Sequence, residues 1–218
     1  MKREKQQKTI LIILFVFSCL LYSNTLNHNY VLDDFSVIKE NTIVKKGISG
    51  IPEIFRTHYR EGYGYVQGNL FRPLALSLFA VQWEIAPDSP SFGHFLNILL
   101  YGILIALLYI YLNHLFKNEV ISFIACLLFA AHPIHTEVVA NIKSGDDIMA
   151  FLFFIGSSLL LFKHINSKRK SQLILSVILL FFGFLSKEST VTFLGVIPLT
   201  LILFKDFSFK DAAVKSSW

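Results

Sequence analysis

The chain has 218 residues, of which 54% are hydrophobic and only 16% are charged. Soluble domains carry roughly 25% charged residues. Here the apolar residues form long runs, which excludes an ordinary soluble domain and predicts an all-α integral membrane protein with several spans. The formal net charge of +5 lies mainly in the N-terminal tail and in short loops, as membrane topology requires, so no nucleic-acid partner is predicted.

The N-terminal residues 1–8 form a predicted cytoplasmic tail, because basic residues before a span hold that end in the cytoplasm. These basic residues are Lys2, Arg3, Lys5 and Lys8. The first span is predicted from Thr9 to about Tyr22. Since no small-x-small cleavage site follows it, the span is interpreted as an uncleaved signal anchor. Residues 24–92 then form a long external loop.

This external loop contains more than connecting residues. Asp33 and Asp34 lie about ten residues after the first span. A helix is predicted from Ile48 to Tyr59, because Pro52 suits a first helical turn. A further helix from Leu74 to Ile85 is apolar nearly all round, which favours a position in the membrane interface or under the spans.

The rest of the chain alternates between apolar runs and short polar loops. The remaining predicted spans are 92–116, 120–131, 148–162, 173–185 and 191–204. A second external loop covers 132–147, and a basic loop at 163–170 returns the chain to the cytoplasm, in agreement with the N-terminal orientation. The sequence therefore predicts a module at 9–204 with about six transmembrane helices and interfacial helices in the first external loop. Residues 205–218 are predicted as a truncated cytoplasmic tail.

On this topology five polar groups share the external face and are predicted to converge on one cleft. They are Asp33-Asp34, Arg72, His132/His135/Glu137, Asp146-Asp147 and Lys187-Glu188. Charged groups at a membrane edge are costly to desolvate, so each is expected to have a partner or a task.

Asp33 and Asp34 are the first candidate pair. One carboxylate is a candidate general base for an acceptor hydroxyl or amine, and its neighbour would raise its pKa by like-charge repulsion. The alternative is structural, because an aspartate followed by Phe35-Ser36-Val37-Ile38 also fits a helix N-cap. The spacing leaves both interpretations open.

His132, His135 and Glu137 have a spacing that resembles metal ligands. A zinc site needs a tetrahedral arrangement and usually three protein ligands. Pro133 prevents a regular helix through the first histidine. The alternative is that these residues position the loop, so a divalent metal stays an open hypothesis and the metal site is unknown.

Arg72 and Lys187 are candidate phosphate ligands. The guanidinium fork of arginine suits bidentate binding, whereas lysine holds a phosphate as a point charge. Lys187 could instead form an internal ion pair with Glu188, and the sequence leaves this alternative open.

The order of these motifs is similar to a known family. The motifs are Asp33-Asp34-Phe35, Phe71-Arg72-Pro73-Leu74, His94-Phe95-Leu96-Asn97, His132-Pro133-Ile134-His135-Thr136-Glu137, Asn141-Ile142-Lys143-Ser144-Gly145-Asp146-Asp147 and Ser186-Lys187-Glu188. Together they resemble the N-terminal half of GT-C glycosyltransferases, in the protein O-mannosyltransferase-like branch that often carries C-terminal tetratricopeptide repeats. The resemblance covers residues 29–204.

The resemblance implies an inverting transfer on the external or lumenal face. The donor would be a polyprenyl-phosphate-linked sugar such as mannose, and the acceptor a hydroxyl on a protein, lipid or glycan. Asp33 or Asp34 would be the catalytic base, with a slight preference for Asp33. Asp146 or Asp147 would form a second acidic site for the acceptor or a metal. Arg72 and Lys187 would neutralise the donor phosphate, while His132, His135, Glu137 and Glu188 would position loops.

Two features depart from the family pattern. Gly145 stands where relatives often have arginine, which removes one cation unless Arg72 substitutes for it. The sequence also stops after about six predicted spans, roughly half the number in complete members. The alternative function is therefore a catalytically incomplete scaffold or partner in cell-envelope glycan assembly. A small transporter is disfavoured, because transporters place such charges near the bilayer midplane. The Lys-, Ile-, Asn- and Phe-rich composition favours a bacterial inner membrane with a cytoplasmic N-terminus and a periplasmic active face.

Overall fold

The computed structural model describes residues 2–64 and 70–205, and every regular element in these ranges is helical. The α-helices are labelled α, and the 3₁₀- and π-helices are labelled η. In chain order they are α1 (Lys2–Leu21), η1 (Ser23–Asn27), η2 (Phe35–Lys39), η3 (Val44–Gly50), α2 (Ile51–Ile54), η4 (Glu61–Tyr63), α3 (Pro73–Ile85), α4 (Pro90–Phe116), α5 (Glu119–Ala131), α6 (His135–Ala140), η5 (Ile142–Ser144), α7 (Gly145–Ser167), α8 (Lys170–Ser186), α9 (Thr190–Phe193) and α10 (Val196–Lys205). The all-α prediction is therefore confirmed for the described residues. Of the predicted tail, residues 206–218 lie outside them.

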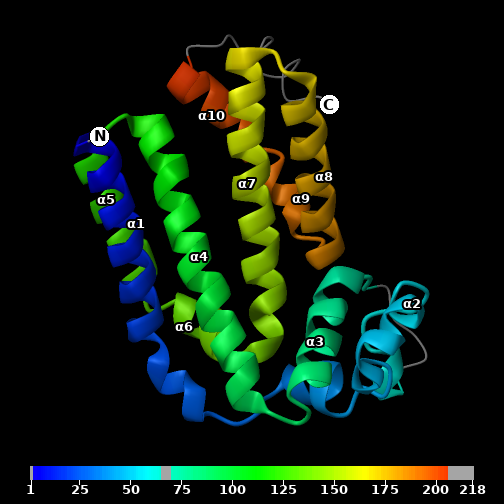
Figure 1. Ribbon diagram of the computed structural model, residues 1–218. Helices are drawn as coiled ribbons and strands as arrows, with labels where there is room; N and C mark the ends of the chain where they lie inside the picture. The colour runs from blue at the N-terminus through cyan, green and yellow to red at the C-terminus, as the bar shows by residue number, and fades with distance from the viewer. Residues whose placement is uncertain (1, 65–69, 206–218) are drawn as a thin grey trace.

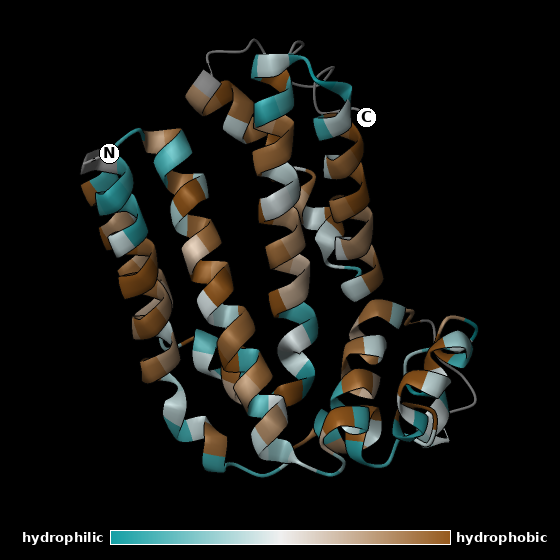
Figure 2. Ribbon diagram, in the orientation of Figure 1, coloured by the Kyte–Doolittle hydropathy of each residue, from teal (hydrophilic) through white to brown (hydrophobic). Residues whose placement is uncertain are grey.

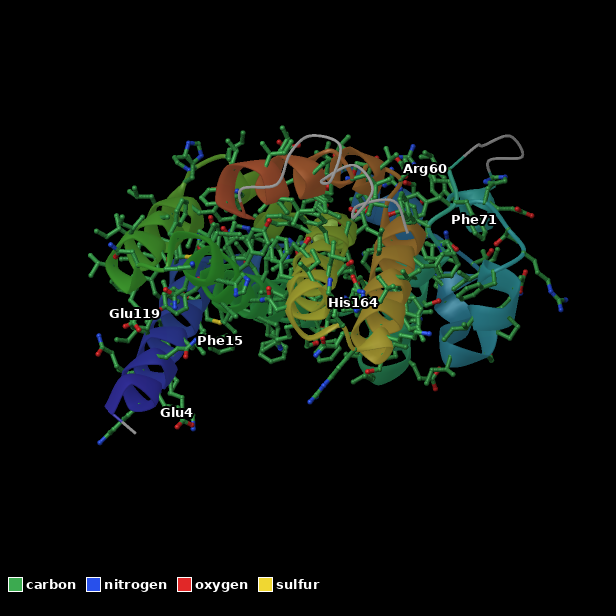
Figure 3. All side chains as sticks on the ribbon, turned by 90° about the horizontal axis from the view of Figure 1, so that it is seen from above. Glu4, Phe15, Arg60, Phe71, Glu119 and His164 are labelled. Carbon is green, nitrogen blue, oxygen red and sulfur yellow. The ribbon has the colours of Figure 1, made fainter. Side chains whose placement is uncertain are left out.

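Four long helices stand side by side in the order α1, α4, α7 and α8 (Figure 1). Helix α5 packs against α1 and α4. The end of α1 and the starts of α4 and α7 lie at one end of this bundle, with α3 and α2 beside them (Figure 1). Seen along the helices, Arg60 and Phe71 lie on the side opposite Glu4 and Glu119 (Figure 3). The first long loop thus folds into a lateral unit next to α7 and α8.

Local sequence signals explain where several helices begin. The Ser89 hydroxyl accepts a hydrogen bond from the Phe92 N–H, and Pro90 occupies the first turn of α4. The Asn118 side chain accepts hydrogen bonds from two N–H groups at the start of α5. Both are the short polar residues that satisfy unpaired N–H groups at a helix start. These caps fix the loops before α4 and α5.

Two apolar cores hold the molecule together. The larger lies within the bundle and includes Tyr101, Ile105, Tyr109 and Phe154. The smaller lies in the lateral unit. Its members include Val37, Ile54, Tyr59, Phe79 and Ile142. Ile142 lies in η5, directly before the start of α7 that carries Asp146. The smaller core therefore attaches the loop to the start of this helix.

Two helical segments are long and apolar enough to cross a membrane, Pro90–Phe116 and Ile142–Ser167. The predicted six spans are not confirmed. Helix α5 has only 13 residues, or about 20 Å at the usual rise, whereas a bilayer core is about 30 Å thick. The predicted sixth span is divided into α9 and α10 at Leu194 and Gly195.

The bundle nevertheless has the surface expected in lipid. Hydrophobic residues fill the middle of the long helices, and hydrophilic residues gather near their ends (Figure 2). Large apolar side chains are exposed on several helices, including Leu20, Leu128, Ile174 and Phe181. Such extended exposed apolar surface is uncommon on monomeric soluble proteins and favours contact with a membrane.

Candidate functional site

Asp146 is the centre of a buried ionic cluster at the start of α7. Its side chain has no exposed surface. The Arg72 guanidinium donates to Asp146 Oδ2 through Nη1 at 2.7 Å, and the Tyr59 hydroxyl donates to the same oxygen at 3.3 Å. The Lys143 ammonium lies 3.4 Å away. The first turn of a helix also favours a negative charge, so this carboxylate is stabilised by both cations and backbone.

Arg72 connects this cluster to the turn after α8. It precedes Pro73, which opens α3, and its side chain is only 7% exposed. Its Nε and Nη2 donate to the two Glu188 oxygens at 2.8 and 2.5 Å. Burial lowers the pKa of Arg72, but the hydrogen bonds that it donates to Glu188 and the charge of Asp146 outweigh burial and raise the pKa overall. The guanidinium therefore stays charged.

Lys187, which directly precedes Glu188, completes the cluster. Its Nζ donates to Asp147 Oδ2 at 2.5 Å and lies 3.6 Å from Asp146 Oδ1. The cluster consists of three cations and three carboxylates whose formal charges balance. They are Arg72, Lys143 and Lys187 with Asp146, Asp147 and Glu188. Three of the five groups expected to converge are therefore in direct contact, namely Arg72, Asp146-Asp147 and Lys187-Glu188. A single external cleft shared by all five groups stays a prediction.

Tyr59 and Lys143 were not predicted as site residues. The Tyr59 ring lies 4.9 Å from Arg72 Cζ, in the geometry of a cation–π contact. Burial, followed by the charge of Asp146, raises the pKa of Tyr59 well above its usual value, so its hydroxyl remains a donor. Lys143 stands three residues before Asp146, a spacing that brings side chains together on a helix and could have been noticed. Nothing in the local sequence distinguishes Tyr59.

Asp34 joins the first long loop, residues 24–92, to this cluster. It is fully buried, and its Oδ1 accepts from the Lys143 backbone N–H at 2.7 Å while Oδ2 accepts from the Val31 N–H at 3.0 Å. The alternative N-cap interpretation is wrong for Asp34, because its side chain makes no capping hydrogen bond to η2. Burial raises the pKa of Asp34, backbone donors including Val31 and Lys143 oppose this, and the charge of Asp33 adds to it.

Asp33 has a different environment although it is adjacent. Its side chain is 47% exposed, and its Oδ1 lies 2.8 Å from Arg60 Nη2. Solvent therefore reaches this carboxylate, whereas both Asp34 oxygens already accept backbone donors. Of the two candidate bases, Asp33 is therefore the more accessible to solvent.

His132, His135 and Glu137 lie apart from the contacts of the ionic cluster. The His135 ring packs 4.2 Å from the Phe129 ring, and burial lowers the pKa of His135. His132 and Glu137 are exposed. Within residues 2–64 and 70–205, no group of three or more His, Cys, Asp or Glu side chains could hold a metal ion. These three residues do not fit the ligand set of a zinc site, and their role in positioning the loop stays a prediction.

Comparison with known proteins gives a consistent family. Residues 73–214 match the family described as dolichyl-phosphate-mannose-protein mannosyltransferase. The human protein O-mannosyl-transferase TMTC1 is 34% identical over 63% of this chain and 16% of its own length. Mouse protein O-mannosyl-transferase TMTC2 is 33% identical over 68% of this chain and 18% of its length. A Caenorhabditis elegans protein O-mannosyl-transferase, F38B6.6, is 29% identical over 90% of this chain and 28% of its length. The chain thus spans less than a third of these relatives, and no solved structure matches it.

Proposed function

The chain belongs to the dolichyl-phosphate-mannose-protein mannosyltransferase family, and from this premise we propose that it forms the N-terminal part of a membrane glycosyltransferase. The sugar, mannose by analogy with the names of its relatives, passes from a polyprenyl-phosphate donor to a hydroxyl on a protein, lipid or glycan. Transfer inverts the anomeric carbon and takes place on the external or lumenal face. In a bacterium this is the periplasmic face of the inner membrane, with the N-terminus in the cytoplasm.

The observation that carries this proposal is the buried Arg72 guanidinium beside Lys187. A polyprenyl-phosphate sugar departs as a phosphate, so the reaction needs fixed cations at the leaving group more than a strong acid. Arg72 presents two parallel N–H donors, the arrangement that binds two phosphate oxygens. Lys187 adds a point charge from the adjoining turn. Asp146 and Asp147 hold these cations in place and form the proposed acceptor-side acidic site.

Asp33 is the proposed base, because it is accessible while Asp34 is engaged with backbone donors. In the proposed reaction the acceptor oxygen attacks the anomeric carbon as Asp33 takes the hydroxyl proton. The bond from the anomeric carbon to the phosphate oxygen breaks, and its electron pair leaves with the polyprenyl phosphate. Arg72 and Lys187 bind the charge that develops on this phosphate.

A substitution in the full-length gene product tests this assignment. Asp33→Asn keeps the size of the side chain and removes its basicity, so transfer of labelled mannose from a polyprenyl-phosphate mannose donor should fall at least about 100-fold. Asp88→Asn is the matched control, because Asp88 is an exposed carboxylate in the same loop. Expression and thermal unfolding should be unchanged in both variants.

Full transfer by Asp33→Asn would remove Asp33 from the catalytic role. If the wild-type gene product binds the donor but transfers nothing to any hydroxyl acceptor, the enzymatic proposal fails. The scaffold in cell-envelope glycan assembly then becomes the better account of this membrane protein.

A further inference from the structure

Glu188 occupies the part of Arg72 that a phosphate would need. Its two oxygens accept hydrogen bonds from Nε and Nη2 at 2.8 and 2.5 Å. The third guanidinium nitrogen, Nη1, donates to buried Asp146. A carboxylate and a phosphate present two oxygens to an arginine fork in the same way. The fork is therefore an anion site that already contains a side chain of the protein.

The two partners of Arg72 differ in how easily they can leave. The Asp146 side chain is fully buried, but the Glu188 side chain is 56% exposed. Glu188 belongs to the short turn between α8 and α9, and water can solvate its carboxylate once it leaves the fork. Lys187, the preceding residue, is anchored separately to Asp147. The Glu188 side chain can swing outward while this anchor stays in place.

The charge balance of the cluster also favours replacement of Glu188 by another anion. The cluster is formally neutral with Glu188 in place, and its departure leaves one positive charge. A sugar linked to a polyprenyl alcohol through a phosphodiester carries a single negative charge. Exchange of Glu188 for such a group preserves neutrality in a buried site, where an unpaired charge is costly.

We propose that Glu188 is a displaceable occupant of the donor-phosphate site, which leaves the Arg72 fork when a lipid-linked phosphodiester enters. This inference rests on the proposed function, since it assumes that Arg72 binds the donor phosphate. Binding of the donor then has to compete with an internal carboxylate. The competition excludes weak anions from the fork and couples donor entry to movement of the turn after α8.

The test measures binding of farnesyl phosphoryl mannose, a short phosphodiester donor, to the full-length protein in dodecyl maltoside micelles. Glu188→Gln and Glu188→Ala should both bind it about 10-fold more tightly than the wild type, because the charged competitor is gone. Glu40→Gln, which removes an exposed carboxylate of the first external loop, should leave the affinity unchanged. Farnesol, which lacks the phosphate, should bind all variants equally.

Other outcomes separate the possible failures. If Glu188→Ala weakens binding, Glu188 positions Arg72 and is not a competitor, so the inference is overturned while the phosphate site stands. If Arg72→Ala in the Glu188→Gln background leaves binding intact, the donor-phosphate assignment itself fails. If phosphatidylcholine displaces the probe with equal affinity, ordinary phospholipid headgroups occupy the fork and the link to the glycosyl donor is overturned.

Discussion

The adjacent carboxylates Asp33 and Asp34 should respond in opposite ways to the same substitution. Asp34 is fully buried and accepts backbone hydrogen bonds from Val31 and Lys143. Asp33 is half-exposed and paired with Arg60. We expect Asp34→Asn to lower the free energy of unfolding, and Asp33→Asn to leave it nearly unchanged while transfer is lost.

The structure sets the size of each effect. An asparagine at position 34 retains one acceptor oxygen, so one of the two backbone N–H donors loses its partner, at a cost of about 1–3 kcal/mol. Removal of the buried charge returns part of this cost, because burial already raises the pKa of Asp34. The net loss for Asp34→Asn is therefore about 1–2 kcal/mol, and Asp34→Ala, which leaves both donors unpaired, should lose about 2–5 kcal/mol. A half-exposed ion pair such as Asp33–Arg60 contributes about 0–1 kcal/mol.

The assay is unfolding of each purified variant by sodium dodecyl sulfate in maltoside micelles, followed by circular dichroism. Transfer activity is measured on the same preparations. A destabilisation by Asp33→Asn equal to that by Asp34→Asn would contradict the reasoning, because it would mean that accessibility does not separate the two carboxylates. An Asp34→Ala variant as stable as the wild type would show that the hydrogen bonds of Asp34 to the backbone do not contribute to the free energy of unfolding.

Two further predictions concern the ionic cluster. Tyr59→Phe removes the hydrogen bond to Asp146 and should lower the free energy of unfolding by about 1 kcal/mol. Tyr59→Leu also removes the ring over Arg72, so it should lower the free energy of unfolding by roughly a further 0.5–2 kcal/mol. Equal losses for the two variants in the same detergent titration would contradict the cation–π contact. The hydrogen bond from Arg72 holds the pKa of Glu188 below its usual value of 4.5. The contribution of ionised Glu188 to stability is therefore fully present above pH 4.5, and it is lost as the pH falls through the pKa of Glu188 in the folded state. Thermal unfolding temperatures measured from roughly pH 6 to roughly pH 3 should therefore fall less in Glu188→Gln than in the wild type. An identical fall in both proteins would exclude this contribution of Glu188.

The helices of this protein could be located from the sequence because their signals are local. Apolar runs mark the long helices, and α4 begins at Pro90, two residues before its predicted beginning at Phe92. Helix α7 begins at Gly145, before the predicted Ile148, because its first turn contains the charged Asp146 and Asp147 that hydropathy assigned to a loop. Local signals thus fail where a helix start is polar and buried. They also overestimate the predicted helix from Ile48 to Tyr59, where the only α-helix is the short α2 (Ile51–Ile54).

The candidate site depends on contacts that no local pattern contains. Arg72 and Glu188 are separated by 116 positions, and spacing could predict that both lie on one face but not that they bind each other. Asp33 and Asp34 are indistinguishable in sequence. They differ in the structure, where Asp34 is buried against the Lys143 backbone and Asp33 is half-exposed. Tyr59 joined the site through the packing of the smaller core, which brings its hydroxyl to Asp146.

Under the proposed function, the ionic cluster serves binding more than stability. Desolvation of buried charges consumes much of the energy of their pairing, and well-packed apolar residues often hold the same segments equally well or better. Here the charges gather at the start of α7, where the first long loop and the turn after α8 meet. An apolar contact could fasten these segments, but it could not release one anion and accept another. The structural feature that makes this possible is the contrast around Arg72, with one partner fully buried and the other half-exposed.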